Sequence, residues 1–503
     1  MQDILFSQQH PNSPVYKDYQ YPDSSSLFKR VSESYDLWQS YFLMKEANNG
    51  NALAQHELAI RYLLGKGFQA DTVKSVYWTQ KAAAQNLAAA NYNLGIFMNN
   101  GWGTEWNPFG AYEYFLKAAQ DSMVEAEYVV GLMYLDNLVV PRDLHKSYLY
   151  IKKAAASGYK PAKEVLLELN KYLAGFGYDP DPSDNTKKSQ SDSTAISYVN
   201  PAVSMSYLSF REDSLNKVDD ITLLKEVLRE GDEELKHALG TVTISDSTLK
   251  ADMKVINIVK KAAESGSPEA QTMLGRCYEK GIGVKRDLVL AAVQYIRATR
   301  LDSRRAPRLL MSLIQNPEFF SLLKTQLDRK NSDARFAYAG LVALRLNFQV
   351  PESEAFRFLK EAVAEGHVPS IVEMGMCYYT GNLTKQDKKK AIETWQQAVN
   401  MGSSEARVRI AIANVQDNFV YEDSAMSIKS LTEASSAGSL LADMALAHCY
   451  EAGTGVKMDK MQAIHYYRIC LQRGSQGAYR ALKRIYDQLR PGNPEFIVIG
   501  DEP

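Results

Sequence analysis

The feature that most constrains the fold is a repeat with a period of 36 residues. Similar stretches begin at Ala54, Ala90 and Ala126, each 36 residues after the last, and a clearer copy begins at Ala270. Such a period is typical of a helix pair that stacks on the next pair and buries a shared core. The later copies begin at Ala334, Ser370, Ala406, Ala442 and Ala478.

Each copy is predicted to be two helices joined by a tight turn. In the clearest copy, Ala270, Leu274 and Tyr278 are spaced by four residues and fall on one face of the first helix. Gly275, beside Leu274, would let a neighbouring helix approach closely.

The ends of the helices carry recurrent capping residues. Gly-x-Gly turns follow the first helix at Gly65/Gly67, Gly101/Gly103, Gly281/Gly283 and Gly453/Gly455. An aspartate suited to cap the second helix comes next, at Asp71, Asp143, Asp287, Asp387 and Asp459. The second helix ends at a residue suited to the left-handed conformation, which is Asn86, Gly158, Gly266, Gly402 or Gly474. Prolines suited to the first turn of the next helix are Pro161, Pro268 and Pro369.

This pattern resembles the Sel-one-like repeat (SLR) family, a relative of the tetratricopeptide repeat with a longer loop between its helices. The motif A-x-x-x-L-G-x-x-Y-x-x-G-x-G-V-x-x-D-x-x-x-A is met closely at Ala270–Ala291 and Ala442–Ala463. The resemblance covers residues 35–175 and 215–488. It implies an all-α fold, a right-handed superhelical α-solenoid of about ten to eleven antiparallel helix pairs with a period of about 36 residues.

Two interruptions divide the predicted array. Residues 173–212 are rich in Asp, Ser, Pro and Gly, which favours a flexible loop inserted within one repeat, and the alternative is a degenerate extra repeat. A step of 28 residues from Ala306 to Ala334 lacks the Gly-x-Gly turn and indicates a shortened hairpin. The expected organisation is a disordered N-terminal segment (1–24), an N-terminal repeat block (25–172), a flexible insertion (173–212), the first part of a second block (213–303), a shortened atypical repeat (304–333), C-terminal repeats (334–488) and a C-terminal tail (489–503).

The net charge and the hydropathy of the chain limit the classes of partner and the compartment that we expect. The chain has 58 basic and 59 acidic residues, so its net charge gives no reason to expect nucleic acid as the main partner. No stretch approaches the roughly 18 apolar residues of a membrane span. The first 21 residues lack the basic start and apolar core of a signal peptide. We therefore expect a cytoplasmic protein without membrane insertion, with export by another route left open.

Residues that suggest chemistry recur with the repeat. The Gly-x-Gly pairs precede no strand-to-helix turn, so they do not indicate a phosphate site. The densest group of metal-binding residue types is His448, Cys449, His465 and Cys470, but neighbouring helical residues point about 100° apart, which suits a shared metal poorly. Cys277, Cys377 and Cys449 each precede the tyrosine of their repeat, which predicts buried, reduced thiols. We expect no catalytic residue, no metal and no cofactor, and thus no enzyme.

The remaining candidate function is protein binding. A solenoid of helix pairs has a concave surface formed mainly by its first helices, where aromatic rings and amides suit a peptide. We therefore expect a scaffold or adaptor for a protein or peptide partner. The alternatives are a permanent subunit of a larger complex and, less favoured, an enzyme or small-ligand receptor. The predicted partner-binding residues are His56, Tyr92, Asn99, Asn100, Tyr128, Arg276, Lys280 and Tyr379.

Overall fold

The computed structural model describes residues 40–174, 227, 253–346, 351–417 and 423–498. The chain falls into two compact units. The first takes residues 1–212 and 476–503, and the second takes residues 213–475. The predicted N-terminal segment, nearly all of the predicted insertion and the tail from residue 499 onward lie outside the described residues.

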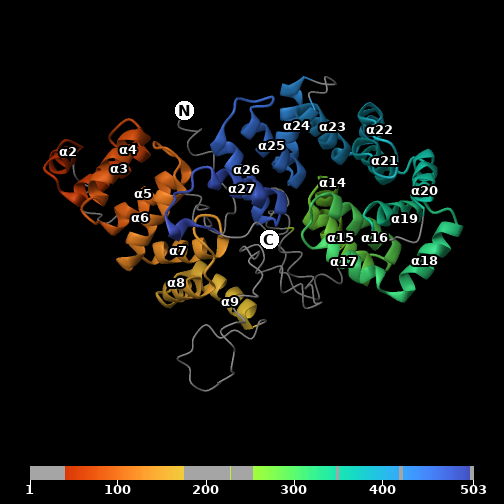
Figure 1. Cartoon of the computed structure of the whole chain (residues 1–503), viewed down its shortest axis with the longest axis horizontal. Coiled ribbons are helices and arrows are strands. Elements are labelled where there is room, and N and C mark those ends of the chain that lie inside the picture. The colour runs from red at the N-terminus through yellow and green to blue at the C-terminus, as the bar shows by residue number, and fades with distance from the viewer. Residues whose placement is uncertain (1–39, 175–226, 228–252, 347–350, 418–422, 499–503) are drawn as a thin grey trace, which may run out of the picture. The chain divides into compact units, whose positions relative to one another are not determined.

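The first unit is built from helices that pack against their neighbours along the chain (Figure 1). The pairs α3–α4, α5–α6 and α7–α8 begin 36 residues apart, as the repeat predicts. The helices are α2 (Ser40–Asn48), α3 (Ala52–Leu64), α4 (Thr72–Ala83), α5 (Ala88–Asn100), α6 (Pro108–Gln120), α7 (Val124–Asp136), α8 (Leu144–Ala156), α9 (Lys160–Ala174) and α27 (Gln476–Asp487), with a short 3-10 turn η5 (Pro494–Phe496).

The second unit continues the same pattern of paired helices. Its core passes from pair to pair, and one buried cluster runs from Leu288 to Ala413. The helices are α14 (Met253–Glu264), α15 (Pro268–Lys280), α16 (Leu288–Arg300), α17 (Ala306–Ile314), α18 (Pro317–Asp328), α19 (Ser332–Ala343), α20 (Glu352–Ala364), α21 (Val368–Thr380), α22 (Lys388–Asn400), α23 (Ser404–Asp417), α24 (Ser424–Ser436), α25 (Leu440–Ala452) and α26 (Lys460–Gln472). In the described parts of both units there is no β-strand, and none of the helices has an apolar run long enough to cross a membrane.

The predicted caps of the second helices are confirmed. The backbone N–H of Lys74, for example, donates to Asp71 Oδ1 at 2.9 Å. The turn glycines adopt left-handed backbone, with φ of 74° at Gly281 and 63° at Gly283, a conformation that favours glycine. The same aspartate cap is present before α4, α8, α16, α22 and α26.

The close helix approach predicted at Gly275 is also confirmed and recurs in other pairs. In the pair α5–α6, a Cβ added to Gly95 would lie 2.7 Å from Cε1 of Phe115, so the ring occupies the space that a side chain would need. Gly131 with Ile151, Gly275 with Tyr295 and Gly375 with Trp395 make the same contact.

The shortened hairpin consists of α17 and α18, of 9 and 12 residues. Asn316 caps α18, since its Oδ1 accepts from the Glu318 N–H at 3.0 Å, and Pro317 lies in the first turn. Both features agree with the sequence. At the C-terminal end, residues up to Ser475 belong to the second unit and α27 belongs to the first.

Replacing Gly95 with alanine should destabilise the chain, although alanine is the better helix former. Overpacking against Phe115 costs about 1–3 kcal/mol. With three ring atoms within 3.0 Å of the added Cβ, we expect this cost to exceed the roughly 1 kcal/mol that alanine gains over glycine within a helix. Urea unfolding followed by circular dichroism measures the change. Gly492→Ala, with nothing within 4 Å of the added Cβ, is the control. Adding Phe115→Leu to Gly95→Ala should recover part of the loss, and no recovery would contradict the packing explanation.

Candidate partner-binding surfaces

The predicted partner-binding residues of the first unit lie in its interior. Tyr92 is 1 % exposed, and its ring centroid lies 5.6 Å from that of Phe115. Tyr128 is fully buried, with its ring 5.3 Å from that of Tyr159. The structure gives these side chains a packing role, and partner binding by them stays a prediction. The buried predicted residues are His56, Tyr92, Asn99, Asn100 and Tyr128.

The first helices of this unit are buried around almost their whole circumference. Every residue of α7 from Ala126 to Leu135 is buried, and α5 is buried from Ala89 to Phe97. A helix with apolar residues all round is buried on every side, whereas a stripe of apolar residues implies one free face. The sequence feature that indicated the burial of α7 is the nearly unbroken apolar run at 128–135.

In the second unit, predicted residue Arg276 is buried in a polar contact within its own helix pair. Its Nη1 lies 2.8 Å from Glu279 Oε2, and the Tyr295 hydroxyl donates to the same oxygen at 2.6 Å. Burial, together with the negative charge of Glu279, raises the pKa of Tyr295 well above its ordinary value, so the hydroxyl remains a donor. The contact joins α15 to α16.

The last pair of the second unit repeats this arrangement with histidine in place of arginine. The Tyr467 hydroxyl donates to Glu451 Oε2 at 2.6 Å and lies 2.8 Å from His448 Nδ1. These residues occupy the positions of Tyr295, Glu279 and Arg276. The polar residues at these positions therefore hold the two helices of a pair together.

Two of the predicted residues remain accessible. Lys280 is exposed at the end of α15, and Tyr379 is half-buried near the end of α21. The Tyr379 ring lies 5.4 Å from that of Trp395, and Lys388 Nζ lies 5.3 Å from the Tyr379 ring centroid. The ring is thus held in place by packing while part of its surface faces outward.

Ion pairs connect helices of the second unit that are distant in sequence. Arg300 of α16 contacts Glu373 of α21 at 2.5 Å. Glu405 of α23 contacts Arg409 at 2.7 Å and Arg297 of α16 at 3.7 Å. Burial opposes the ionisation of Glu405, but the two guanidinium groups outweigh it and hold the pKa of this carboxyl below its ordinary value. These side chains are therefore occupied within the chain.

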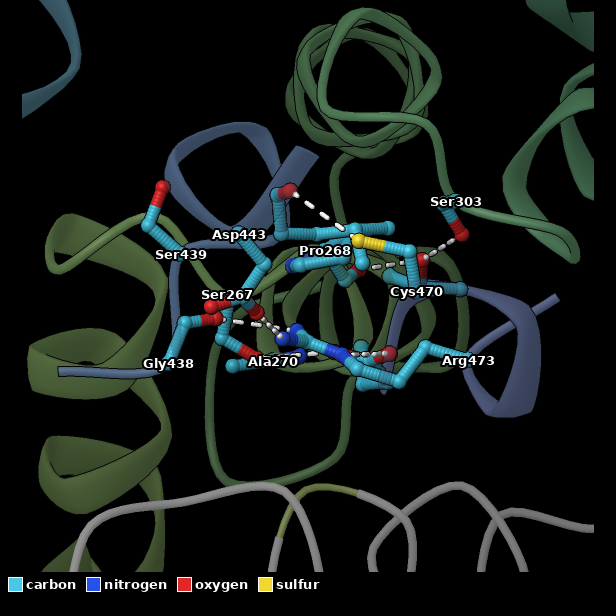
Figure 2. Close-up of polar contacts among 12 residues, drawn as sticks. Ser267, Pro268, Ala270, Ser303, Gly438, Ser439, Asp443, Cys470 and Arg473 are labelled. Atoms are coloured by element: carbon cyan, nitrogen blue, oxygen red, sulfur yellow. Dashed lines mark hydrogen bonds and ion pairs between the residues drawn. The ribbon is translucent and has the colours of Figure 1, made fainter. Parts of the chain in front are cut away.

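Arg473, which follows α26, connects the two ends of the second unit (Figure 2). Its guanidinium donates to Glu269 Oε2 at 2.7 Å and to the Gly438 carbonyl at 2.9 Å, and it contacts Asp443 Oδ2 at 3.3 Å. The Arg473 side chain is only 2 % exposed. Since Glu269 lies in the first turn of α15, the pair α15–α16 contacts the pair α25–α26, and the second unit closes on itself.

The first unit contains a surface at the start of α6, which we call the aromatic surface, formed by Trp106, Phe109 and Tyr112. It is covered by the C-terminal segment, residues 476–498 of the same unit. The Tyr486 ring lies 5.1 Å from that of Trp106, and the Phe496 ring lies 5.3 Å from Phe109 and 5.9 Å from Tyr112. Phe496 is completely buried by this contact and its surroundings.

Arg490 supplies the polar part of this contact. Its guanidinium carbon lies 5.2 Å from the Phe109 ring centroid. One terminal nitrogen donates to the Leu138 carbonyl at 2.7 Å, and the other donates to the Val139 carbonyl at 3.1 Å. Both carbonyls belong to the loop that follows α7. The segment is therefore held by apolar burial and by charge-assisted hydrogen bonds to backbone.

The four cysteines are free and buried, as predicted for Cys277, Cys377 and Cys449. Burial raises the pKa of Cys449 to about 11 and raises the pKa values of Cys377 and Cys470 as well. A thiol of high pKa is a poor nucleophile at neutral pH. In the part of the chain that the structure describes, no three or more His, Cys, Asp and Glu side chains are grouped as metal ligands.

Comparison with known protein families agrees with this architecture. Six segments match the Sel1 repeat, and each contains one helix pair: residues 52–87, 88–122, 124–159, 268–302, 368–403 and 440–474. The chain therefore contains six Sel1 repeats. It has the all-α helical repeat fold of this family, and Sel1-repeat proteins generally mediate protein–protein interactions.

Several curated proteins share part of this repeat array. The chain is 29% identical over 182 residues to "DAP3-binding cell death enhancer 1" of Mus musculus and 25% identical to that of Rattus norvegicus, covering 34% of this chain and 35% of each relative. It is 22% identical over 246 residues to "Uncharacterized protein NMB1327" of Neisseria meningitidis serogroup B, covering 48% and 51%. The chain thus spans a third to a half of the length of these relatives.

Two solved structures of repeat proteins were also matched. One is a protective antigen of uropathogenic Escherichia coli strains with an SLR fold, at 17% identity and a TM-score of 0.30, covering 90% of this chain and 91% of that one. The other is a Sel1 repeat protein from Oxalobacter formigenes, at 19% identity and a TM-score of 0.23, covering 88% and 89%.

Replacing Arg473 with methionine should strongly destabilise the second unit. The substitution leaves the buried Asp443 carboxylate and the partly buried Glu269 carboxylate without their cation. Breaking a buried pair in this way costs about 3–5 kcal/mol. Urea unfolding and amide hydrogen exchange in α15 measure the loss. Arg286→Met, which breaks an exposed pair with Glu318, is the matched control and should change little. Equal effects of the two substitutions would contradict the role given to Arg473.

The cysteines should be unreactive in the folded chain. At pH 8 an aromatic disulfide reagent should modify the thiols slowly, because burial keeps them protonated and inaccessible. After unfolding in urea, all four thiols should react at once. A thiol that reacts in the folded chain as fast as free cysteine would contradict this prediction.

Proposed function

We propose that this chain is a non-enzymatic scaffold or adaptor that binds a protein or peptide partner. The observation that carries the proposal is the set of six Sel1 repeats, because this repeat generally mediates protein–protein interactions. The two rodent relatives are named for binding DAP3, which supports a partner-binding role for the shared repeats.

The contacts that the polar residues make within the chain support a scaffold more than an enzyme. Arg276, a predicted partner-binding residue, and His448, which is of a metal-binding type, contact a glutamate or tyrosine of their own helix pair. The thiols are buried and free, which also suits a reducing compartment such as the cytoplasm. We therefore assign no reaction to the chain and place it in the cytoplasm.

The proposed partner-facing residues on the first helices of the second unit are Tyr379 and Lys280. Tyr379 offers an aromatic ring whose orientation is already set by Trp395, so little entropy is lost when a partner covers it. Lys280 offers a cation at the corresponding end of α15. An extended or helical peptide with an apolar residue and a carboxylate matches both groups.

Affinity capture with the full chain from cells that express it naturally tests the proposal. A bound protein should be recovered with the wild-type chain, and Tyr379→Ala with Lys280→Glu should weaken its binding roughly tenfold, the range expected for an aromatic anchor. Quantitative mass spectrometry identifies the protein, and titration with the purified partner gives the affinity.

Lys429→Glu serves as the control, since the Lys429 side chain is 78% exposed and lies on α24, away from the proposed residues. This variant should bind the partner like the wild-type chain. Recovery of no specific protein would overturn the scaffold function. Unchanged binding by the double variant would overturn the assignment of Tyr379 and Lys280.

A further inference from the structure

Two residues of the aromatic surface, Trp106 and Phe109, are not required by the repeat. Counted by the period of 36, the positions of Trp106 and Phe109 correspond to Ala70 and Val73 in the preceding repeat. Val73 is 64% exposed. In the following repeat, the position of Phe109 holds the exposed His145. The helix pair therefore forms without a large apolar side chain at this position, and the aromatic residues serve the contact with the C-terminal segment.

The C-terminal segment begins in phase with the repeat, since Ala478 lies 36 residues after Ala442, but α27 belongs to the first unit and not to the unit of α25 and α26. The segment has a helical part, α27, followed by a short tail that ends in η5. Tyr486, Arg490 and Phe496, spaced by four and six residues, are among the side chains that make the contact. The Tyr479 hydroxyl also accepts from Asn137 Nδ2 at 3.5 Å. The rings of Tyr486 and Phe496 fill the aromatic surface, and the guanidinium donates to backbone carbonyls. Such carbonyls accept equally from any suitably placed donor, so the surface does not require this particular segment.

We propose that the aromatic surface is a docking surface for a partner segment of this chemistry, and that the C-terminal segment occupies it as an intramolecular competitor. The partner segment is an amphipathic helix with a short tail, carrying an aromatic ring, an arginine four residues later and a second ring in the tail. This inference deepens the proposed scaffold function and rests on it.

The position of the segment in the chain suits a competitor. A segment tethered to its own docking surface has an effective concentration on the order of millimolar. It therefore excludes weak ligands, whereas a ligand that binds tightly or is abundant displaces it. Because residues 476–498 follow the last helix of the second unit, their release uncovers the aromatic surface without opening any helix pair of the first unit.

The test uses the full chain and a fluorescein-labelled synthetic peptide with the sequence of residues 476–498. Fluorescence anisotropy should show weak binding to the wild-type chain, because its own segment is in place. In the loosened variant, with Arg490→Ala and Phe496→Ala, the chain's own C-terminal segment binds the aromatic surface less tightly. The peptide should therefore bind this variant at least about tenfold more tightly than it binds the wild-type chain. Adding Phe109→Ala to this variant should abolish the gain.

The matched control is the variant with Leu489→Ala and Ile497→Ala. These neighbouring side chains are 45% and 48% exposed, so the variant should bind the peptide as weakly as the wild-type chain. A peptide with alanine at the positions of Arg490 and Phe496 should bind none of the chains. If the loosened variant loses helical circular dichroism, Arg490→Lys replaces it, since lysine keeps the charge but lacks the planar fork. This variant should show an intermediate gain.

Three results would overturn the proposal. The first is a folded, loosened variant that binds the peptide no better than the wild-type chain. The second is peptide binding that survives Phe109→Ala. The third is a wild-type dimer in light scattering that dissociates on Phe109→Ala, which would assign the surface to a second copy. Since the peptide itself supplies the ligand, these results are independent of whether affinity capture recovers a partner.

Discussion

The contact between a glycine of the first helix and a large side chain of the second sets the spacing within several of the helix pairs. Because Gly95 has no side chain, Phe115 packs on the backbone of α5. In α15 the same approach at Gly275 brings Tyr295 near enough to donate its hydroxyl hydrogen to Glu279. The polar contacts that join the helices thus depend on the apolar one, and a side chain added at the glycine would disturb both.

The caps and turns could be predicted from the sequence because each is decided within a few residues. Asp71 caps α4 through the N–H of Lys74, three positions away, and the conformation of Gly281 depends on its own backbone. Each repeat copy supported the prediction for the others, since the capping aspartate and the turn glycines recur at the same spacing. Helix identity and pairing followed from these local patterns.

The candidate surfaces could be predicted less well, because whether a side chain is open to a partner depends on distant residues. Tyr92 and Tyr128 fall at plausible surface positions of the repeat, yet both are buried. The contact of Arg490 with the loop after α7 joins residues more than 300 positions apart, and no local sequence pattern predicts it. The available signal was the departure of Trp106 and Phe109 from the repeat, which predicts an unusual surface but not its occupant.

The contact of Arg473 with Glu269 changes how the second unit behaves as a repeat array. In an open solenoid, each repeat interacts with its neighbours alone, so stability grows by addition and repeats can be gained or lost in evolution. Here Glu269 and Arg473, 204 residues apart, join two repeats that are not neighbours in the chain. During synthesis, the Glu269 carboxylate can form its ion pair with Arg473 only after the last repeat of the unit has been made. An extra repeat inserted between the two would separate them, so the length of this unit is limited by its closure.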